Sequence, residues 1–144
     1  MRQRLQSYAI TAIAYQRRRV FQRTAIADLF IATLFRYRDG GRFLLHSFVA
    51  MPDHIHVLLT PAADQTVEGC AKLIKGGFSF AVRKAYAGEI WQPGYHPHRV
   101  TDEDDFRNQL AYIENNPIRK NFVEYPHVHT AAQYVDRLDA PPPF

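Results

Sequence analysis

Residues 48–61, FVAMPDHIHVLLTP, contain the end of one apolar run and the whole of a second, separated by Pro52-Asp53. The runs cover residues 42–51 and 54–60, and they predict neighbouring strands of one sheet, either as an antiparallel hairpin or as a bulged continuation of a single strand. Two histidines, His54 and His56, lie in the second run. Successive strand residues point to opposite faces, so both imidazoles should project to the same side of the sheet.

Strand and helix patterns alternate on either side of this pair of runs. Further strands are predicted at residues 8–15 and 95–100, and helices at residues 24–39, 66–87 and from 101–104 to Pro117. Thr24 is the expected N-cap of the first helix, and TDED at residues 101–104 resembles a capping box for the third. Pro97 places the strand at 95–100 on a sheet edge. The order indicates an α+β sandwich with a mostly antiparallel sheet.

The chain length and composition predict one globular domain over residues 1–144. Of its 144 residues, 47% are hydrophobic and 22% charged, which is ordinary for a folded protein. Cys70 is the sole cysteine, which excludes an internal disulfide and is compatible with a reducing cytoplasm. The first residues contain no apolar run long enough for a signal peptide or a membrane span, so a cytoplasmic location is expected.

The positive charge is concentrated in the first part of the chain. Residues 1–42 contain nine Arg and two acidic residues, whereas residues 43–144 contain nine Lys and Arg against twelve acidic residues. Arginine forks onto phosphates and stacks on bases, so nucleic acid is the partner that this asymmetry favours. A solvated basic surface with no ligand is the alternative, because charge alone indicates only non-specific attraction.

Two imidazoles side by side on a strand can chelate a divalent metal ion, since neutral histidine is the commonest protein metal ligand. The alternative is a pair of hydrogen-bonded histidines facing the surface. The same spacing occurs in His96-Pro-His98, on the predicted edge strand, and in His127-Val-His129, where a surface turn is expected. The pair His54 and His56 differs from both because it lies on what reads as a central strand.

The third predicted helix contains Tyr112 and Asn116, four residues apart and therefore stacked on one face. That face lies off the inward stripe of Phe106, Leu110 and Ile113. The alternative is a purely structural role, in which Tyr112 covers the sheet edge and Asn116 caps the helix before Pro117.

Three motifs occur in order: FVAMPDHIHVLL, IWQPGYHPHRVTDEDDF and LAYIENNPIRKNFV. Together they resemble the REP-associated tyrosine transposases, which belong to the single-tyrosine, IS200-like transposase group named for its His-hydrophobic-His (HUH) motif. The resemblance covers about residues 8–123 and leaves 124–144 as a C-terminal tail. It implies a ferredoxin-like α+β sandwich.

The resemblance also implies the chemistry of the site. His54 and His56 would bind the metal, Asn116 would supply a third ligand, and Tyr112 would be the nucleophile. The metal would be Mg²⁺ or Mn²⁺, because an amide oxygen suits a hard octahedral ion, while the histidines alone leave zinc open. Family members cleave and rejoin single-stranded DNA through a 5′-phosphotyrosine and a free 3′-hydroxyl.

The partner implied is single-stranded or hairpin DNA of repetitive extragenic palindromes, with a cytoplasmic, nucleoid-associated location. The residues expected to contact phosphates are Arg17, Arg18, Arg19, Lys72, Lys75, Arg83, Arg119 and Lys120. Trp91, Tyr95 and Phe43 are candidates for base stacking, with core packing as the commoner outcome. Two rivals stay open: a hairpin-binding protein without turnover, and a metal-dependent nuclease that uses water. Relatives act as monomers or as homodimers, and the sequence does not decide between them.

Overall fold

The structure is a computed structural model that describes residues 5–119 and 128–129. Its strands are β1 (Tyr8–Ile13), β2 (Phe43–Met51), β3 (His54–Pro61), β4 (His96–Arg99) and β5 (Val128–His129), and its α-helices are α1 (Thr24–Asp39), α2 (Val67–Val82) and α3 (Glu103–Arg119). The sheet order is β4-β1-β3-β2-β5, and each pairing is antiparallel. The order β4-β1-β3-β2, with α1 after β1 and α2 after β3, confirms the ferredoxin-like α+β prediction.

Strands β2 and β3 form an antiparallel hairpin whose turn is Pro52-Asp53, which selects the first of the two arrangements predicted. Met51 lies opposite His54 at the turn, and a bulge interrupts the register between Leu45 and Ser47. Two hydrogen bonds from the chain after β1 hold the turn in place. The Ala14 N–H donates to the Asp53 carbonyl at 2.9 Å, and the Phe21 N–H donates to the Pro52 carbonyl at 3.0 Å.

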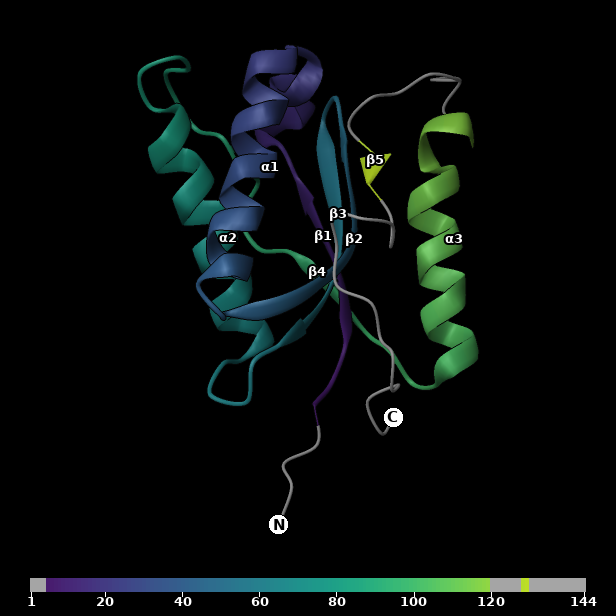
Figure 1. Cartoon of the computed structure of the whole chain (residues 1–144). Helices are drawn as coiled ribbons and strands as arrows, with labels where there is room; N and C mark the ends of the chain where they lie inside the picture. The colour runs from purple at the N-terminus through teal and green to yellow at the C-terminus, as the bar shows by residue number, and fades with distance from the viewer. Residues whose placement is uncertain (1–4, 120–127, 130–144) are drawn as a thin grey trace.

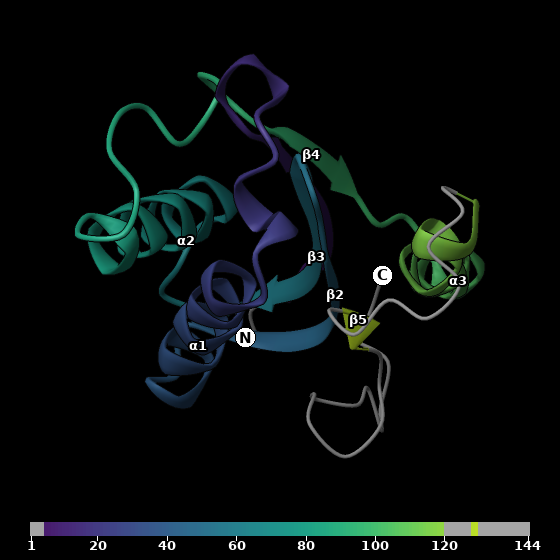
Figure 2. The same ribbon diagram turned by 90° about the horizontal axis from the view of Figure 1, so that it is seen from above.

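Helices α1 and α2 cover one face of the sheet, and α3 stands alone on the other (Figures 1 and 2). The face under α1 and α2 holds the larger core, to which β3 contributes Ile55, Val57 and Leu59. At its centre, aromatic rings lie 5.2–6.5 Å apart: Phe21, Phe30, Phe78 and Trp91. Close aromatic contacts of this kind add to the stabilisation from apolar burial.

The face under α3 has a smaller apolar cluster. It consists of Val49, Met51, Leu58, Val100, Phe106 and Ile113, with Ala9 and Leu110 against it. The predicted inward stripe of α3 is therefore confirmed. Since Leu58 shares the parity of His54 and His56 along β3, the two histidines also belong to this face.

Several predicted boundaries are wrong at the helix ends. Thr24 is the first residue of α1 and not its cap, and the flanking Arg23 makes no side-chain cap bond. Helix α2 ends at Val82, five residues before the predicted end. Helix α3 runs past Pro117 to Arg119, because a proline removes one backbone hydrogen bond without preventing helical dihedrals.

The cap of α3 is shifted by one residue from the predicted box. Asp102 accepts from the Asp105 N–H at 2.7 Å, and Asp105 accepts from the Thr101 N–H at 2.9 Å. The surface turn predicted around His127-Val-His129 is wrong for Val128 and His129, which pair with β2 as strand β5. His127 itself lies outside the described residues. Within the part of the chain that is described, no helix combines the length and apolarity needed to cross a membrane.

Candidate active site on the α3 face of the sheet

His54 and His56 stand next to each other on the α3 face, at the end of the sheet near the Pro52-Asp53 turn. Their ring centroids are 4.9 Å apart and their planes are inclined by 81°. β3 is the middle strand of the five, between β1 and β2. The prediction that this pair lies on a central strand is confirmed, because β3 pairs with β1 on one side and with β2 on the other.

Each histidine uses its Nδ1 atom in a hydrogen bond. Asp53 Oδ1 lies 2.7 Å from His54 Nδ1, and Thr11 Oγ1 lies 2.8 Å from His56 Nδ1. Thr11 is the residue directly opposite His56 on β1. With Nδ1 engaged, Nε2 is the nitrogen that each ring presents as a metal ligand.

Asp53 also contacts Arg17, whose Nη1 lies 3.5 Å from Oδ2. Burial alone would raise the pKa of the Asp53 carboxyl. The hydrogen bond and charge of His54, together with the charge of Arg17, outweigh burial and hold that pKa below its ordinary value. The group therefore stays an anion over the neutral pH range.

Tyr112 reaches the histidine pair from α3. Its ring centroid is 5.3 Å from that of His56, with an edge-to-face angle of 86°, and the side chain remains 40% exposed. An exposed tyrosine beside two imidazoles contributes little to the core, so this position does not favour the alternative in which Tyr112 merely covers the sheet edge. Tyr112 and His56 belong to the same chain.

Asn116 lies one helical turn beyond Tyr112, and its side chain is buried with only 1% exposed. Neither Oδ1 nor Nδ2 has a hydrogen-bond partner within the part of the chain that is described. The prediction that Asn116 lies off the buried side of the helix is thus wrong, and so is the capping alternative, because α3 continues to Arg119. An amide buried without partners costs about 1–3 kcal/mol, which calls for an explanation.

Helix α3 runs antiparallel to β3, towards the end of the sheet where His54 lies (Figure 1). The rise from Tyr112 to Asn116 is about 6 Å. The step from His56 back to His54 is about 7 Å in the same direction. Since Tyr112 is beside His56, this spacing predicts that Asn116 comes level with His54, at the same end of the sheet.

Among residues 5–119, no three His, Cys, Asp or Glu side chains are grouped so that they could hold a metal ion. Within the described part of the chain, a third ligand for the histidine pair would therefore be of another type, and the buried Asn116 amide oxygen is a candidate. Two imidazoles and one amide oxygen leave positions for water and phosphate oxygens around an octahedral ion.

The predicted phosphate contacts fall in two segments of the described chain. Arg17, Arg18 and Arg19 follow β1, and Arg17 reaches the turn that contains Asp53. The chain then continues on the side of α1 and α2, since Val20 and Phe21 belong to the core of that face. Gln16 and Arg17 both have φ of 53°, a left-handed conformation that is unusual for residues other than glycine. All three arginines are exposed, and Arg17 contacts the residue next to His54.

Lys72 and Lys75 lie on α2, which covers the other face (Figure 2), and Arg83 directly follows that helix. Lys75 Nζ donates to the carbonyls of Gln92 at 3.3 Å and Gly94 at 2.7 Å, and burial lowers its pKa. These bonds give Lys75 a structural role. Arg119 is described only as part of the α3 backbone, and Lys120 lies outside the described residues.

The other two cations of this group have partners close to them in the sequence: Lys72 pairs with Glu68 at 3.5 Å, and Arg83 stacks on Phe80 at 3.7 Å. Of the three candidates for base stacking, Trp91 and Phe43 are buried in the core and Tyr95 packs against it. The commoner outcome, core packing, is therefore confirmed for them.

Sequence reasoning missed the residues that support the histidines, Asp53 and Thr11. Asp53 adjoins His54 in the sequence and could have been noticed, whereas Thr11 is found only once the register between β1 and β3 is known. A buried polar chain was missed as well: His46 Nε2 and Ser7 Oγ each lie 2.7 Å from Thr60 Oγ1. The His46 ring packs edge-on against Phe106, with centroids 5.1 Å apart.

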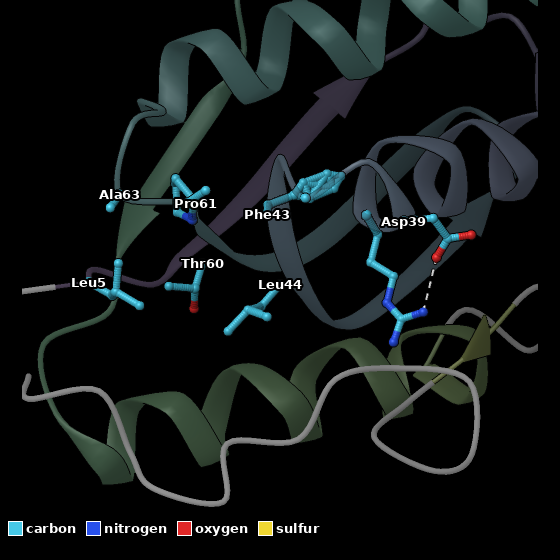
Figure 3. A pocket seen from close by; sticks show the side chains of 10 residues that line it. Leu5, Asp39, Phe43, Leu44, Thr60, Pro61 and Ala63 are labelled. Carbon is cyan, nitrogen blue, oxygen red and sulfur yellow. Dashed lines mark hydrogen bonds and ion pairs between the residues drawn. The ribbon is translucent and has the colours of Figure 1, made fainter.

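A hollow of about 590 Å³ lies at the opposite end of the hairpin (Figure 3). Leu5, Phe43, Leu44 and Pro61 line it, together with the pair formed by Arg38 and Asp39 at 3.1 Å. Thr60, also on its wall, is roughly 20 Å along β3 from His54. None of the predicted metal-binding, catalytic or phosphate-contacting residues lines it, so the hollow and the histidine site are separate.

The chain was compared with known families and proteins. The family model described as "Transposase IS200 like" matches residues 3–116. A REP-associated tyrosine transposase of Escherichia coli K12 is 29% identical over 83 residues, which is 57% of this chain and 48% of that protein. The chain therefore spans about half the length of this curated relative.

The fold was compared with solved structures in the same way. A REP-associated tyrosine transposase bound to a REP hairpin superposes with a TM-score of 0.73 at 22% identity, covering 89% of this chain and 79% of that one. At this identity the likeness is one of fold, and it agrees with the strand order described above.

Proposed function

The chain belongs to the IS200-like transposase family, and from that premise we propose that it cleaves and rejoins single-stranded DNA at hairpins through a covalent link to Tyr112. The observation that carries the proposal is the contact between the Tyr112 ring and the His56 ring, 5.3 Å apart between centroids. The contact places Tyr112, the nucleophile that the motifs imply, beside the histidine pair that they imply, His54 and His56.

In the proposed reaction, Tyr112 Oη attacks the phosphorus atom of a DNA phosphodiester. The Tyr112 oxygen–phosphorus bond forms, the bond from phosphorus to the 3′-oxygen breaks, and the phenol proton is balanced by the proton that the 3′-oxygen gains. The products are a 5′-phosphotyrosine and a free 3′-hydroxyl. The reverse reaction with another 3′-hydroxyl rejoins strands without ATP, because the phosphodiester is conserved in the link.

Mg²⁺ or Mn²⁺, held by His54, His56 and Asn116, would neutralise charge that develops on the phosphate oxygens. The Asn116 amide, which has no hydrogen-bond partner among the described residues, supports this assignment, since a role as metal ligand would account for its burial. His54 and His56 would bind through Nε2, because hydrogen bonds occupy both Nδ1 atoms. The exposed Tyr112 would remain open to the DNA strand.

Hairpin DNA is proposed as the substrate because the solved relative with the same fold is bound to a REP hairpin. Arg17 supports this choice, since its contact with Asp53 places positive charge next to His54. Lys72 and Lys75 lie on the helix that covers the other face of the sheet, and Arg83 directly follows that helix. We therefore assign the phosphate contacts near the reacting bond to Arg17, with Arg18 and Arg19 following it in the chain. Tyr112 would act on the metal site of its own chain, with no second copy required.

The test is to incubate the protein with Mn²⁺ and a single-stranded hairpin oligonucleotide, and to look for an adduct that resists SDS. Wild type should form it, and Tyr112→Phe and the double variant His54→Ala, His56→Ala should not. Tyr95→Phe and His96→Ala are the matched controls, because they remove the same groups elsewhere and should keep the adduct.

Two outcomes would contradict the proposal. Cleavage that survives in Tyr112→Phe without an adduct would indicate a metal-dependent nuclease that uses water. Hairpin binding without any cleavage by the wild type would indicate a binding protein without turnover.

A further inference from the structure

Among the hydrogen bonds that the histidine pair makes with described residues, the bond to Asp53 is the one to an acidic side chain. Its Oδ1 accepts from His54 Nδ1 at 2.7 Å, the short end of the range for a bond between a nitrogen donor and a carboxylate. The carboxylate lies on the side of the ring away from Nε2. It is therefore placed to act on the metal-facing nitrogen through the ring.

The backbone around Asp53 is held in place from outside the hairpin. Its carbonyl accepts from the Ala14 N–H at 2.9 Å, and the preceding Pro52 carbonyl accepts from the Phe21 N–H at 3.0 Å. Pro52 is buried, and Pro fixes its own φ. A side chain on such a support keeps its direction with little loss of entropy.

Arg17 is the competing explanation for Asp53, because it also contacts the carboxylate. That contact is weaker: the distance is 3.5 Å and the Arg17 side chain is 62% exposed. Exposed ion pairs of this kind contribute little, since water and salt screen them. The bond to His54 is shorter and its donor is mostly buried, so the imidazole is the principal partner of the carboxylate.

We propose that Asp53 is a positioning residue for His54, fixing the ring orientation and the tautomer with the proton on Nδ1, so that Nε2 offers its lone pair to the metal ion. The inference rests on the proposed metal site and adds a residue to it. Carboxylates behind metal-bound histidines raise ligand basicity in this way, and their loss typically weakens metal binding 10- to 100-fold.

His56 has a different support, the hydroxyl of Thr11 at 2.8 Å. A hydroxyl can donate or accept, so it does not impose one tautomer. The two rings therefore differ: His54 has an anion that selects its tautomer, and His56 has a neutral group that orients it. This difference places the larger effect on metal affinity at Asp53.

The first experiment measures Mn²⁺ affinity by calorimetry on the full chain without DNA. Asp53→Ala should bind Mn²⁺ about 10- to 100-fold more weakly than wild type. Asp53→Asn, which keeps an oxygen to accept from Nδ1–H, should lose less. Arg17→Ala should bind Mn²⁺ no more weakly than wild type, because it removes the other partner of Asp53 and a positive charge.

The second experiment reads the tautomer directly, by ¹⁵N NMR of the imidazoles at a pH well above the ordinary histidine pKa of about 6.5 and without metal. Wild type should show His54 protonated on Nδ1, and Asp53→Ala should show a mixture of tautomers. A general loss of folding would change many signals, whereas the inference predicts a change confined to His54.

The outcomes separate this inference from the proposed function. If wild type binds no Mn²⁺, the metal site fails. If wild type binds Mn²⁺ and Asp53→Ala binds it equally well, or if the His54 tautomer is unchanged, the role of Asp53 is overturned while the metal site stands. Equal losses in Asp53→Ala and Asp53→Asn would also overturn it, because they would indicate an effect of charge alone.

Discussion

The two faces of the sheet differ in what they bury. The face under α1 and α2 buries a continuous apolar core, with Phe21, Phe30, Phe78 and Trp91 in mutual contact. The face under α3 buries fewer apolar residues, and it also buries polar groups: His46, His56, Thr60 and Asn116. Both faces use the same strands, since the side chains of β3 alternate between them.

This difference indicates that the two faces of the sheet have different roles. An apolar face stabilises the fold by removing hydrocarbon from water, at roughly 25 cal/mol per Å². A face that buries an amide without partners gives up stability at that position, and such positions are typically found where a ligand binds. We therefore expect substitutions on the two faces to separate stability from function.

The largest expected effect on stability comes from the apolar face. Phe78→Ala should lower the free energy of unfolding by about 3–5 kcal/mol, because a fully buried ring leaves a cavity among other rings. Phe106→Ala is the matched change under α3, where the cluster is smaller and the lone helix can adjust, and it should cost less. Urea unfolding measures both, and an equal or larger loss in Phe106→Ala would break the comparison.

An intermediate effect is expected at Asn116. Asn116→Leu should raise the free energy of unfolding of the metal-free protein by about 1 kcal/mol, because it removes buried polar atoms that have no partner in the described chain. The same change should abolish the stabilisation by Mn²⁺, which in wild type should reach about 2.7 kcal/mol at 100 times the dissociation constant.

Urea unfolding with and without Mn²⁺ measures both effects of Asn116→Leu. Asn115→Leu, at the exposed neighbouring position, is the control and should keep the response to Mn²⁺. A destabilised metal-free Asn116→Leu protein would show that the amide serves the fold of this face.

The smallest expected effect concerns the start of α3. Burial alone would raise the pKa of Asp105, but hydrogen bonds from the Thr101 N–H, His98 and Gln109, with the charge of His98, hold it below 3.8. Because the folded-state pKa is lowered, this stabilisation is present above about pH 3.8 and is lost as the pH falls through the folded-state value.

Asp105→Asn should therefore cost about 0.3–1 kcal/mol at neutral pH, because it removes an anion from the first turn of the helix, and its difference from wild type should shrink as the pH falls below 3.8. Asp104→Asn, in the same helical turn but exposed, should change stability less. Unfolding curves across the pH range measure this, and a difference that stays constant with pH would show that Asp105 does not act through its charge.

Much of the fold could be predicted because its signals are local. The Pro52-Asp53 break between apolar runs predicted neighbouring strands, with the hairpin as one of two arrangements, and the alternation along β3 placed His54 and His56 on one face. The helix ends were predicted less well, since the chain past Pro117 and the early end of α2 depend on packing that the residue pattern does not encode.

The site could be predicted only in part. The histidine pair, Tyr112 and Asn116 follow from motifs, but the burial of Asn116 and the bond between Thr11 and His56 depend on contacts between residues far apart in the chain. The helix predicted at residues 66–87 contained Lys72 and Lys75, as α2 does, but the sequence could not reveal that α2 covers the face of the sheet opposite to the histidines.

The most direct test of the account is to digest the wild-type protein after reaction with Mn²⁺ and hairpin DNA, and to locate the attached nucleotide by mass spectrometry. The account predicts a nucleotide joined through a 5′-phosphate to Tyr112. A nucleotide attached to another residue, or cleaved DNA with no nucleotide on the protein, would contradict it.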